Sequence, residues 1–502
     1  MARKAVRSKA PRAASAASWR PAPGEAGIRV RMYRVGFGDF FVVTLLDANA
    51  QPLHILVDCG VFKGTSQSGD LHSIEAAVGD MAALTGGRLE LVVVTHRHAD
   101  HIAGFARCAA VFKKMTVGAV WMPIWESEYE PVAVKFQAEL VRTAFALQRH
   151  FFALGAAASP EQRTALQFME NATGAAGAAA AGSNDAALAL LKRGFAGVTP
   201  KYYRANDKPE VPAALVEAGL AAKVLGPPPL DDLQLMKLMD LQKGVGQYLA
   251  KEAGDEAGAG RPFAGEWEIA PAEALASPGA YAPESFREWT APRKSWGDVT
   301  LAEARAGRVR MEKALQASQP IAALMAAKQL NSFLNNQSLV LLFTFKGRNL
   351  LFVGDAQAGN WEHWLFETDT PDKKGSATVA AAAQKLLASL DFYKVGHHGS
   401  GNATPKAAAD LMTGEGHKFA AMCSTEAHVY GTEDPEDPSK GTEVPRGPLL
   451  DKLASRAALV RSDQIPIKVA GKTTPARVKA ALPGPIPGSR FEKGDFWIDC
   501  FL

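Results

Sequence analysis

The stretch VVVTHRHADHIAGF, residues 92–105, decides the fold of this chain. It begins with an apolar run that predicts a buried strand ending in a polar loop. Side chains two positions apart on an extended chain point to the same side, so His96, His98 and Asp100 can converge on one point. His101 can then turn toward a second point. A helix would separate these side chains, so the stretch predicts a loop at a strand end.

A helix is predicted to follow this loop. Apolar residues repeat at helical spacing over residues 102–112, which places Asp100 and His101 near the start of the helix. Three imidazoles and one carboxylate suit a zinc ion, with manganese or iron as alternatives. The competing interpretation is a polar loop whose histidines make only local hydrogen bonds and bind no metal. Clusters of this kind are typical of metal or catalytic sites, so we expect a metal site.

Composition narrows the class of protein. The 502 residues suffice for two or three domains, or for one domain with large insertions, and the 47% hydrophobic content is that of a globular chain. A net charge of +4 is too small to imply nucleic-acid binding by itself. The four cysteines lie far apart without CxxC spacing, which predicts a reducing, cytoplasmic compartment and argues against a cysteine metal site. No apolar run reaches the length of a membrane span.

The chain divides into five predicted segments. Its N-terminal stretch MARKAVRSKAPRAASAASWR has six basic residues and no acid, and it lacks the apolar centre of a secretory signal. A transit peptide is one interpretation; a disordered tail with weak attraction to phosphates is the one we adopt. The segments are the tail (1–27), the first half of a core (28–124), a helical insertion with a short core strand near 222–226 (125–330), the second half of the core (331–435) and a C-terminal extension with short strands (436–502).

Two later strand ends carry residues of matching chemistry. SLVLLFTF and LLFVGDAQ predict a hairpin that ends in Asp355, and DFYKVG predicts a strand that runs into a loop with His397, His398 and Ser400. Asp355 can bridge two metals because a carboxylate has two oxygens, although a simple turn-forming aspartate is the alternative. Asp58 ends the predicted strand HILVDCG. We expect Asp58 to hydrogen-bond to the histidine loop and hold it in place without binding the metal itself. The alternative is an aspartate that only caps a turn.

These residues resemble the metallo-β-lactamase superfamily of metallo-hydrolases. The matching pieces are Asp58, the THRHADH stretch, Asp355 and His397. Within that superfamily, the order of seven segments looks like the soluble hydrolase domain of DNA-uptake competence channel proteins: VGFGDFFVV, LVDCG, THRHADHIAGF, VLGPP, NNQSLVLLF, LLFVGDA and KVGHHGS. The resemblance covers about 150 residues. The histidine stretch and the GDA…GHHGS pair are specific, whereas VGFGD and LGPP are weak alone.

The resemblance implies a four-layer αββα sandwich with two divalent metal ions, zinc or manganese, at one edge of its sheets. It also implies that His398 and Ser400 face the substrate, and we expect Asp100 to orient the attacking water. The implied ligands are His96 and His98 on the first metal, Asp100, His101 and His397 on the second, and Asp355 between them.

The sequence departs from the superfamily pattern in three places. A further histidine often lies between the histidine stretch and the bridging aspartate, but here that interval holds only His150, in an alanine-rich stretch. The first metal is therefore either weakly held or has another ligand. The usual Gly-His-Pro after the last sheet strand is replaced by Tyr430-Gly431-Thr432, so nearby His428 is either a substitute ligand or a solvated loop residue. Membrane spans of a competence channel are missing, so DNA transport is not expected.

The resemblance and the basic tail favour a hydrolase that uses a metal-activated water, most simply a phosphodiesterase or nuclease acting on DNA or RNA. One fold serves many reactions, so a small nucleotide, lactone or thioester remains an alternative substrate. A non-catalytic, metal-stabilised protein that binds a partner through the insertion is a third hypothesis. No membrane association is expected.

The interval between His101 and Asp355 is far longer than a compact sandwich needs. We therefore expect residues 125–330 to form a mostly helical cap beside the metal cleft. Four basic residues of this cap could contact the phosphates of a substrate: Lys135, Arg142, Lys192 and Arg193. The alternative is that they form only a solvent-exposed face.

Overall fold

The computed structural model describes eleven parts of the chain: residues 19–62, 73–138, 140, 169, 184–231, 327, 330–367, 378–431, 433, 441–469 and 472–502. Most of the expected tail and most of the expected cap, including Arg142 and His150, lie outside the described residues. The chain forms two compact units, and every helix and strand named below belongs to the larger one.

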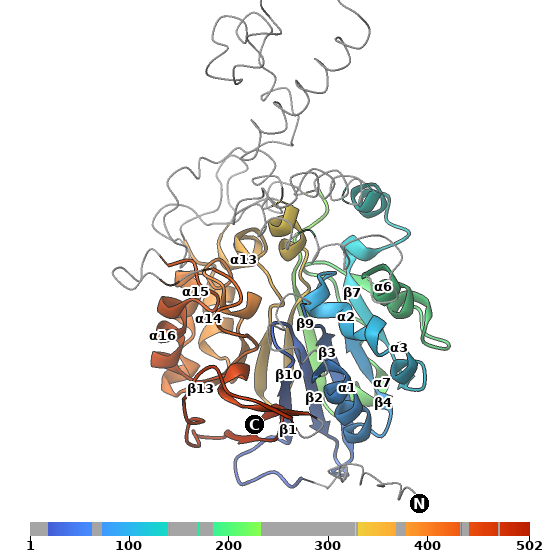
Figure 1. Cartoon of the computed structure of the whole chain (residues 1–502). Coiled ribbons are helices and arrows are strands. Elements are labelled where there is room, and N and C mark those ends of the chain that lie inside the picture. The colour runs from blue at the N-terminus through green and yellow to red at the C-terminus, as the bar shows by residue number, and fades with distance from the viewer. Residues whose placement is uncertain are drawn as a thin grey trace, which may run out of the picture. The chain divides into compact units, whose positions relative to one another are not determined.

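An eight-stranded mixed sheet combines the first half of the chain with its C-terminal end (Figure 1). Its neighbours are antiparallel from β17 to β3 and parallel from β3 to β8. The parallel strand β5 is wholly apolar because both of its faces are covered. In spatial order the strands are β17 (Arg490–Lys493), β18 (Trp497–Phe501), β1 (Ile28–Tyr33), β2 (Phe40–Leu46), β3 (Pro52–Cys59), β5 (Leu91–Val93), β7 (Val120–Pro123) and β8 (Lys201–Tyr203).

A six-stranded sheet holds the second half of the chain. Its strands run parallel from β14 to β11, and β11–β10 and β10–β9 are antiparallel. The predicted hairpin is β10–β11, whose two turn residues Lys346 and Gly347 both have positive φ, as a tight two-residue turn requires. The order is β14 (Ala457–Arg461), β13 (Phe419–Cys423), β12 (Phe392–Lys394), β11 (Arg348–Phe352), β10 (Val340–Phe345) and β9 (Leu220–Gly226).

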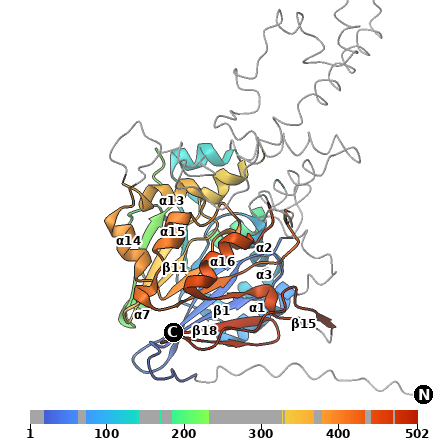
Figure 2. The same ribbon diagram turned by 90° about the vertical axis from the view of Figure 1, so that its left-hand side faces the viewer.

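Three apolar clusters hold these elements together. The first joins side chains of both sheets, for example Val43 with Phe343 and Phe352. The second joins the eight-stranded sheet to α1 (Ser73–Leu84), α2 (Ala99–Arg107), α3 (Ala109–Phe112) and α6 (Asn184–Arg193). The third joins the six-stranded sheet to α13 (Ala358–Leu365), α14 (Ala381–Ala388), α15 (Lys406–Leu411) and α16 (Gly447–Arg456). Figures 1 and 2 show these two helix groups on different sides of the sheets. The predicted mixed α/β class is confirmed.

Short elements complete the description. β4 pairs with β6, and β15 pairs with β16. No helix among the described residues is both long and apolar enough to cross a membrane. The bounds of the short elements are β4 (Arg88–Leu89), β6 (Thr116–Val117), η2 (Ile124–Glu126), α7 (Ala213–Glu217), η7 (His397–Gly399), η8 (Gly414–Gly416), η10 (Ser462–Gln464), β15 (Ile467–Val469) and β16 (Lys472–Thr474).

The predicted segment boundaries need two corrections. Residues 201–226, placed in the insertion except for one short strand, supply an edge strand to each sheet, β8 and β9. Residues 436–502, predicted as an extension, supply β14 to the six-stranded sheet and β17 and β18 to the other. The C-terminal strands pair with β13 and β1, so they complete the two sheets instead of standing apart.

Candidate metal centre

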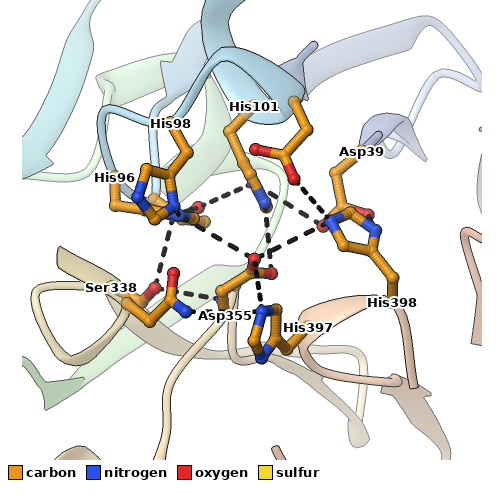
Figure 3. Close-up of polar contacts among 12 residues, drawn as sticks. Asp39, His96, His98, His101, Ser338, Asp355, His397 and His398 are labelled. Atoms are coloured by element: carbon orange, nitrogen blue, oxygen red, sulfur yellow. Dashed lines mark hydrogen bonds and ion pairs between the residues drawn. The ribbon is translucent and has the colours of Figure 1, made fainter. Parts of the chain in front are cut away.

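The carboxyl ends of strands from both sheets bring their polar residues to one place (Figure 3). The histidine loop connects β5 to α2, Asp355 follows β11, and His398 follows β12. Two clusters of potential metal ligands lie there, both completely buried, and they share Asp355. One consists of His96, His98 and Asp355; the other consists of Asp100, His101, Asp355 and His398. We call them the first and second ligand groups.

The first ligand group converges through one nitrogen of each imidazole. Nε2 of His96 lies 2.9 Å from Nδ1 of His98 and 3.9 Å from Oδ2 of Asp355. The other nitrogen of His96 faces two hydroxyl groups, 3.2 Å from Thr95 and 3.4 Å from Ser338. The same Ser338 hydroxyl accepts the backbone N–H of Asp355 at 3.0 Å, so one serine positions both ligands.

The second ligand group lies on the other side of Asp355. Nε2 of His101 is 3.1 Å from Oδ1 of Asp355, and Nε2 of His398 is 3.1 Å from Oδ2 of Asp100. His398 Nε2 is also 3.7 Å from Oδ2 of Asp355. The carboxylate of Asp355 therefore occupies the bridging position between the two groups.

Hydrogen bonds determine which imidazole nitrogens are available as ligands. Nδ1 of His101 lies 2.7 Å from Oδ2 of Asp58, and Nδ1 of His398 lies 2.9 Å from the carbonyl oxygen of Ser424. An N–H donated at Nδ1 leaves the lone pair on Nε2, which points into the second group. Asp58 also accepts the backbone N–H and the hydroxyl of Thr95, at 2.8 and 2.7 Å. It lies behind the ligands, where the sequence placed it.

The two adjacent histidines exchange their expected positions. His398, expected to face the substrate, is fully buried in the second group. His397, expected as its ligand, is 19% exposed and joins neither group, although its Nε2 lies 3.8 Å from Oδ2 of Asp355. His397 donates from Nδ1 to Oδ1 of Asn402 at 3.0 Å, and its Nε2 lies 3.3 Å from Nδ2 of Asn335. Both histidines have positive φ, +46° and +53°, so strand alternation does not predict their directions.

The remaining candidates lie outside the two groups. Ser400 is partly exposed and donates from Oγ to Oδ1 of Asn402 at 2.9 Å, which places it beside His397. His428 is exposed, and among the described residues it joins no ligand group. Of the two interpretations left open for His428, the structure therefore favours the solvated loop residue.

Sequence reasoning missed a buried ion pair, Asp39 with Lys394. The Lys394 ammonium contacts the Asp39 carboxylate, lies 3.0 Å from the carbonyl oxygen of Gly354, and lies 3.8 Å from Oδ1 of Asp355. Asp39 in turn lies 3.7 Å from Nδ1 of His101. A lysine at the end of an otherwise apolar strand was the available signal, because lysine is almost never fully buried unless it is paired.

Glycines allow the backbone around the centre to pack closely. A Cβ atom on Gly60 would lie 2.1 Å from the carbonyl carbon of Asp100 and from the nitrogen of His101. A Cβ atom on Gly38 would lie 2.9 Å from the Asp100 carbonyl oxygen, which already accepts the backbone N–H of Asp39 at 2.8 Å. The first turn of α2 is therefore held against the loops after β1 and β3.

The charges of the centre suit bound cations. Burial lowers the pKa of His98 to about 4, so this imidazole is a neutral donor. Burial alone would raise the pKa of Asp100, but the close contact with the His398 imidazole, 3.1 Å away, lowers it to about 2. Burial likewise opposes the charge of Asp355, and the neighbouring imidazoles, first His101, keep its pKa well below the ordinary value. Ionised carboxylates at full burial require cationic partners. Against the effect of burial, Asp355, Asp58 and Asp39 raise the pKa of His101, and Asp355, Asp39 and Asp100 raise that of His398, so a bound cation would take the place of protons on these imidazoles.

Several donor atoms are also left without hydrogen bonds. Both carboxylate oxygens of Asp355 and Nε2 of His101 are buried and make no hydrogen bond of normal geometry. Imidazole and carboxylate donors grouped in this way suit zinc, and manganese is compatible with the carboxylates. The residues present therefore fit a pair of divalent cations that share Asp355.

Two of the three described basic residues that were expected to meet phosphates form ion pairs with glutamates. Lys192 is buried, with its ammonium 3.8 Å from Glu126, and Arg193 forms an exposed ion pair with Glu128 at 2.8 Å. Lys135 is exposed. Glu126 also binds Arg97 through two bonds of 2.7 and 2.8 Å, which links the histidine loop to η2.

Comparison with known proteins gives no family assignment. No protein-family model matches the chain, and no curated protein matches it.

Proposed function

We propose that this chain is a metal-dependent hydrolase with two divalent cations, and that it cleaves phosphodiester bonds in nucleic acid. The observation that carries the proposal is the shared position of Asp355 between two fully buried groups of histidine and aspartate. A purely structural metal site is closed by four ligands around one ion, and it has no need of a second group on the same carboxylate.

We further infer that the two sheets and their helices form the four-layer αββα sandwich of the metallo-β-lactamase superfamily. Support comes from the three apolar clusters, one between the sheets and one between each sheet and its helices. The position of both ligand groups at the carboxyl ends of strands from both sheets agrees with this architecture.

In this proposal His96 and His98 hold the first cation, Asp100, His101 and His398 hold the second, and Asp355 contacts both. Bound cations of this kind lower the pKa of a shared water and stabilise the attacking and leaving oxygens of a phosphodiester. Asp100 would accept a hydrogen bond from that water and orient it. His397 and Ser400, which are the partly exposed polar groups of the loop after β12, would face the substrate in place of His398.

Nucleic acid is the proposed substrate because of the segment order that resembles the competence-protein hydrolase domain and because of the basic N-terminal stretch. A small nucleotide, lactone or thioester and a non-catalytic metal protein are the competing hypotheses. The four cysteines are free thiols and all are buried, which supports a reducing, cytoplasmic location.

Metal analysis combined with hydrolysis assays tests the proposal. The purified protein should contain about two transition-metal ions per chain after incubation with zinc or manganese. It should then cleave bis(4-nitrophenyl) phosphate and either DNA or RNA, single-stranded or double-stranded. Failure to bind any divalent ion would exclude a metal centre. Two bound ions without cleavage of any phosphodiester would favour the non-catalytic hypothesis.

A pair of variants links the activity to the centre. Asp100→Ala should reduce hydrolysis at least ~100-fold while the protein remains folded, because a cation ligand and the proposed water acceptor are lost together. The exposed His428→Ala should leave both metal content and activity unchanged. An Asp100→Ala protein with activity within a few-fold of the parent would remove Asp100 from the mechanism.

A further inference from the structure

Lys394 is a permanent cation inside the candidate metal centre. It lies at the end of β12 and is 2% exposed. Within the described part of the chain its ammonium contacts three oxygens: the Asp39 carboxylate, the Gly354 carbonyl at 3.0 Å and Oδ1 of Asp355 at 3.8 Å. Oxygens from two separate segments, the loop before β2 and the turn after β11, surround one buried ammonium and make a cation position that is already filled by the chain.

Apart from Asp355, which belongs to both ligand groups, the group members that lie close to the Lys394–Asp39 pair are His101 and His398 of the second group. Asp39 lies 3.7 Å from Nδ1 of His101 and 3.5 Å from Nδ1 of His398, so it faces the backs of both imidazoles of that group. Lys394 approaches Oδ1 of Asp355, the same oxygen that lies 3.1 Å from Nε2 of His101. The oxygen of Asp355 nearest to His96 is the other one, Oδ2.

Asp39 also belongs to a third cluster, with Asp58 and His101, that has ligand atoms close enough to hold a cation. The Lys394 ammonium is placed against the Asp39 carboxylate of this cluster. The Asp39 carboxylate is therefore paired with the lysine. The Asp58 carboxylate is hydrogen-bonded to Thr95 and to His101.

We propose that Lys394 and Asp39 form a positioning pair for the second metal. The ammonium fixes Oδ1 of Asp355, and through the Gly354 carbonyl it fixes the turn that carries this aspartate. Asp39 fixes the orientation of His101 and His398. The inference deepens the proposed function and rests on the presence of two cations, but it assigns a separate role to residues that are not themselves ligands.

The test removes the pair and keeps its volume and net charge. The double variant Asp39→Asn/Lys394→Met loses one negative and one positive charge. The matched control is Arg31→Met/Asp499→Asn, which removes another buried ion pair, of 2.7 Å, on β1 and β18. Equilibrium titration with zinc, the absorption spectrum after cobalt binding, and thermal unfolding without metal are measured for the parent and both variants.

The parent should bind two ions. The Asp39→Asn/Lys394→Met protein should bind the ion of the first ligand group as the parent does, and it should bind the ion of the second ligand group at least ~10-fold more weakly, as is usual when groups behind metal ligands are lost. Its cobalt spectrum should change only in the bands of the ion that the second ligand group holds, which are those lost in His398→Ala. The control should lose thermal stability without any change in either affinity.

Three outcomes would overturn the positioning role: parental affinity for both ions, equal weakening of both ions, or the same weakening in the control. If the double variant does not fold, Asp39→Asn alone keeps the lysine on the Gly354 carbonyl and should show the same selective loss. A parent that binds fewer than two ions would instead contradict the proposed function itself, so the two failures are distinguishable.

Discussion

At the scale of single residues, the centre depends on which nitrogen or oxygen of each side chain faces inward. His397 and His398 are neighbours of identical chemistry, yet only His398 has its Nε2 within 3.1 Å of Asp100. Left-handed backbone at both positions turns them in directions that neither strand nor helix periodicity describes. The hydrogen bond from Nδ1 of His398 to the Ser424 carbonyl then fixes the tautomer.

This difference predicts opposite effects for two adjacent alanine substitutions. His398→Ala should remove a ligand of the second group, so the chain should bind one ion tightly instead of two. His397→Ala should keep both ions, because its imidazole belongs to neither group, and should weaken only turnover of the substrate. Metal content after dialysis distinguishes the two. Loss of an ion in His397→Ala with both ions kept in His398→Ala would restore the assignment implied by the family resemblance.

At the scale of elements, close backbone contacts set the position of the first turn of α2. Gly60, just after β3, touches the peptide between Asp100 and His101, and Gly104 of the same helix packs against Cys59. A side chain at either glycine would collide with backbone atoms, which cannot move independently of the ligands. The ends of β3 and β5 and the start of α2 therefore form one rigid support for the histidine loop.

Gly60→Ala tests that support. Its methyl group would overlap the Asp100–His101 peptide, so we expect a loss of about 1–3 kcal/mol in the free energy of unfolding and weaker binding of the second metal. Gly79→Ala is the matched control, because Gly79 lies in α1 with no atom within 4 Å of an added Cβ. Alanine there should stabilise the protein by about 0.5–1 kcal/mol. Chemical denaturation measures both, and a neutral Gly60→Ala would contradict the proposed contact.

At the scale of the larger unit, two sheets are completed by segments distant in sequence. β18 lies beside β1, and β14 lies beside β13, so the C-terminal residues contribute to both halves. Buried polar groups in these sheets make the stability of this unit sensitive to pH. His54 on β3 is one of them: it is 4% exposed, and its Nδ1 lies 3.1 Å from the Thr44 hydroxyl.

Burial lowers the pKa of His54 from 6.5 to about 4, against the opposing effect of Glu90. The unfolded chain therefore binds more protons than the folded chain between these two pH values. The contribution of His54 is fully present above pH ~6.5 and is lost as the pH falls toward 4, by ~3 kcal/mol in total.

His54→Gln should remove this part of the pH dependence while it keeps a polar partner for Thr44. The difference in free energy of unfolding between parent and variant, measured in denaturant at pH 7 and at pH 4.5 with a chelator present, isolates His54 from the ligand histidines. The parent should lose more stability than the variant between these pH values. Equal losses in both proteins would show that His54 is not held neutral in the fold.

The sequence by itself determined the strands that carry the chemistry and most of the ligands. Alternation and apolar runs predicted β1, β2, β3, β5 and the β10–β11 hairpin, because strand periodicity is a local property of the chain. The spacing of His96, His98, Asp100 and His101 likewise placed the candidate ligands on one loop. It grouped Asp100 with His96 and His98, which was wrong: Asp100 lies with His101, as the family resemblance implied, because α2 begins at Ala99 and ends the alternation of an extended chain.

Only the tertiary structure decided which residues complete the centre. The choice of His398 over His397, the Asp39–Lys394 pair, and the solvated position of His428 all depend on contacts between segments far apart in sequence. The same is true of the edge strands β8, β14 and β17, which have three, five and four residues and gain their stability from the neighbour they pair with. Local pattern carries no information about such a neighbour, and this is the physical reason the sequence left these points open.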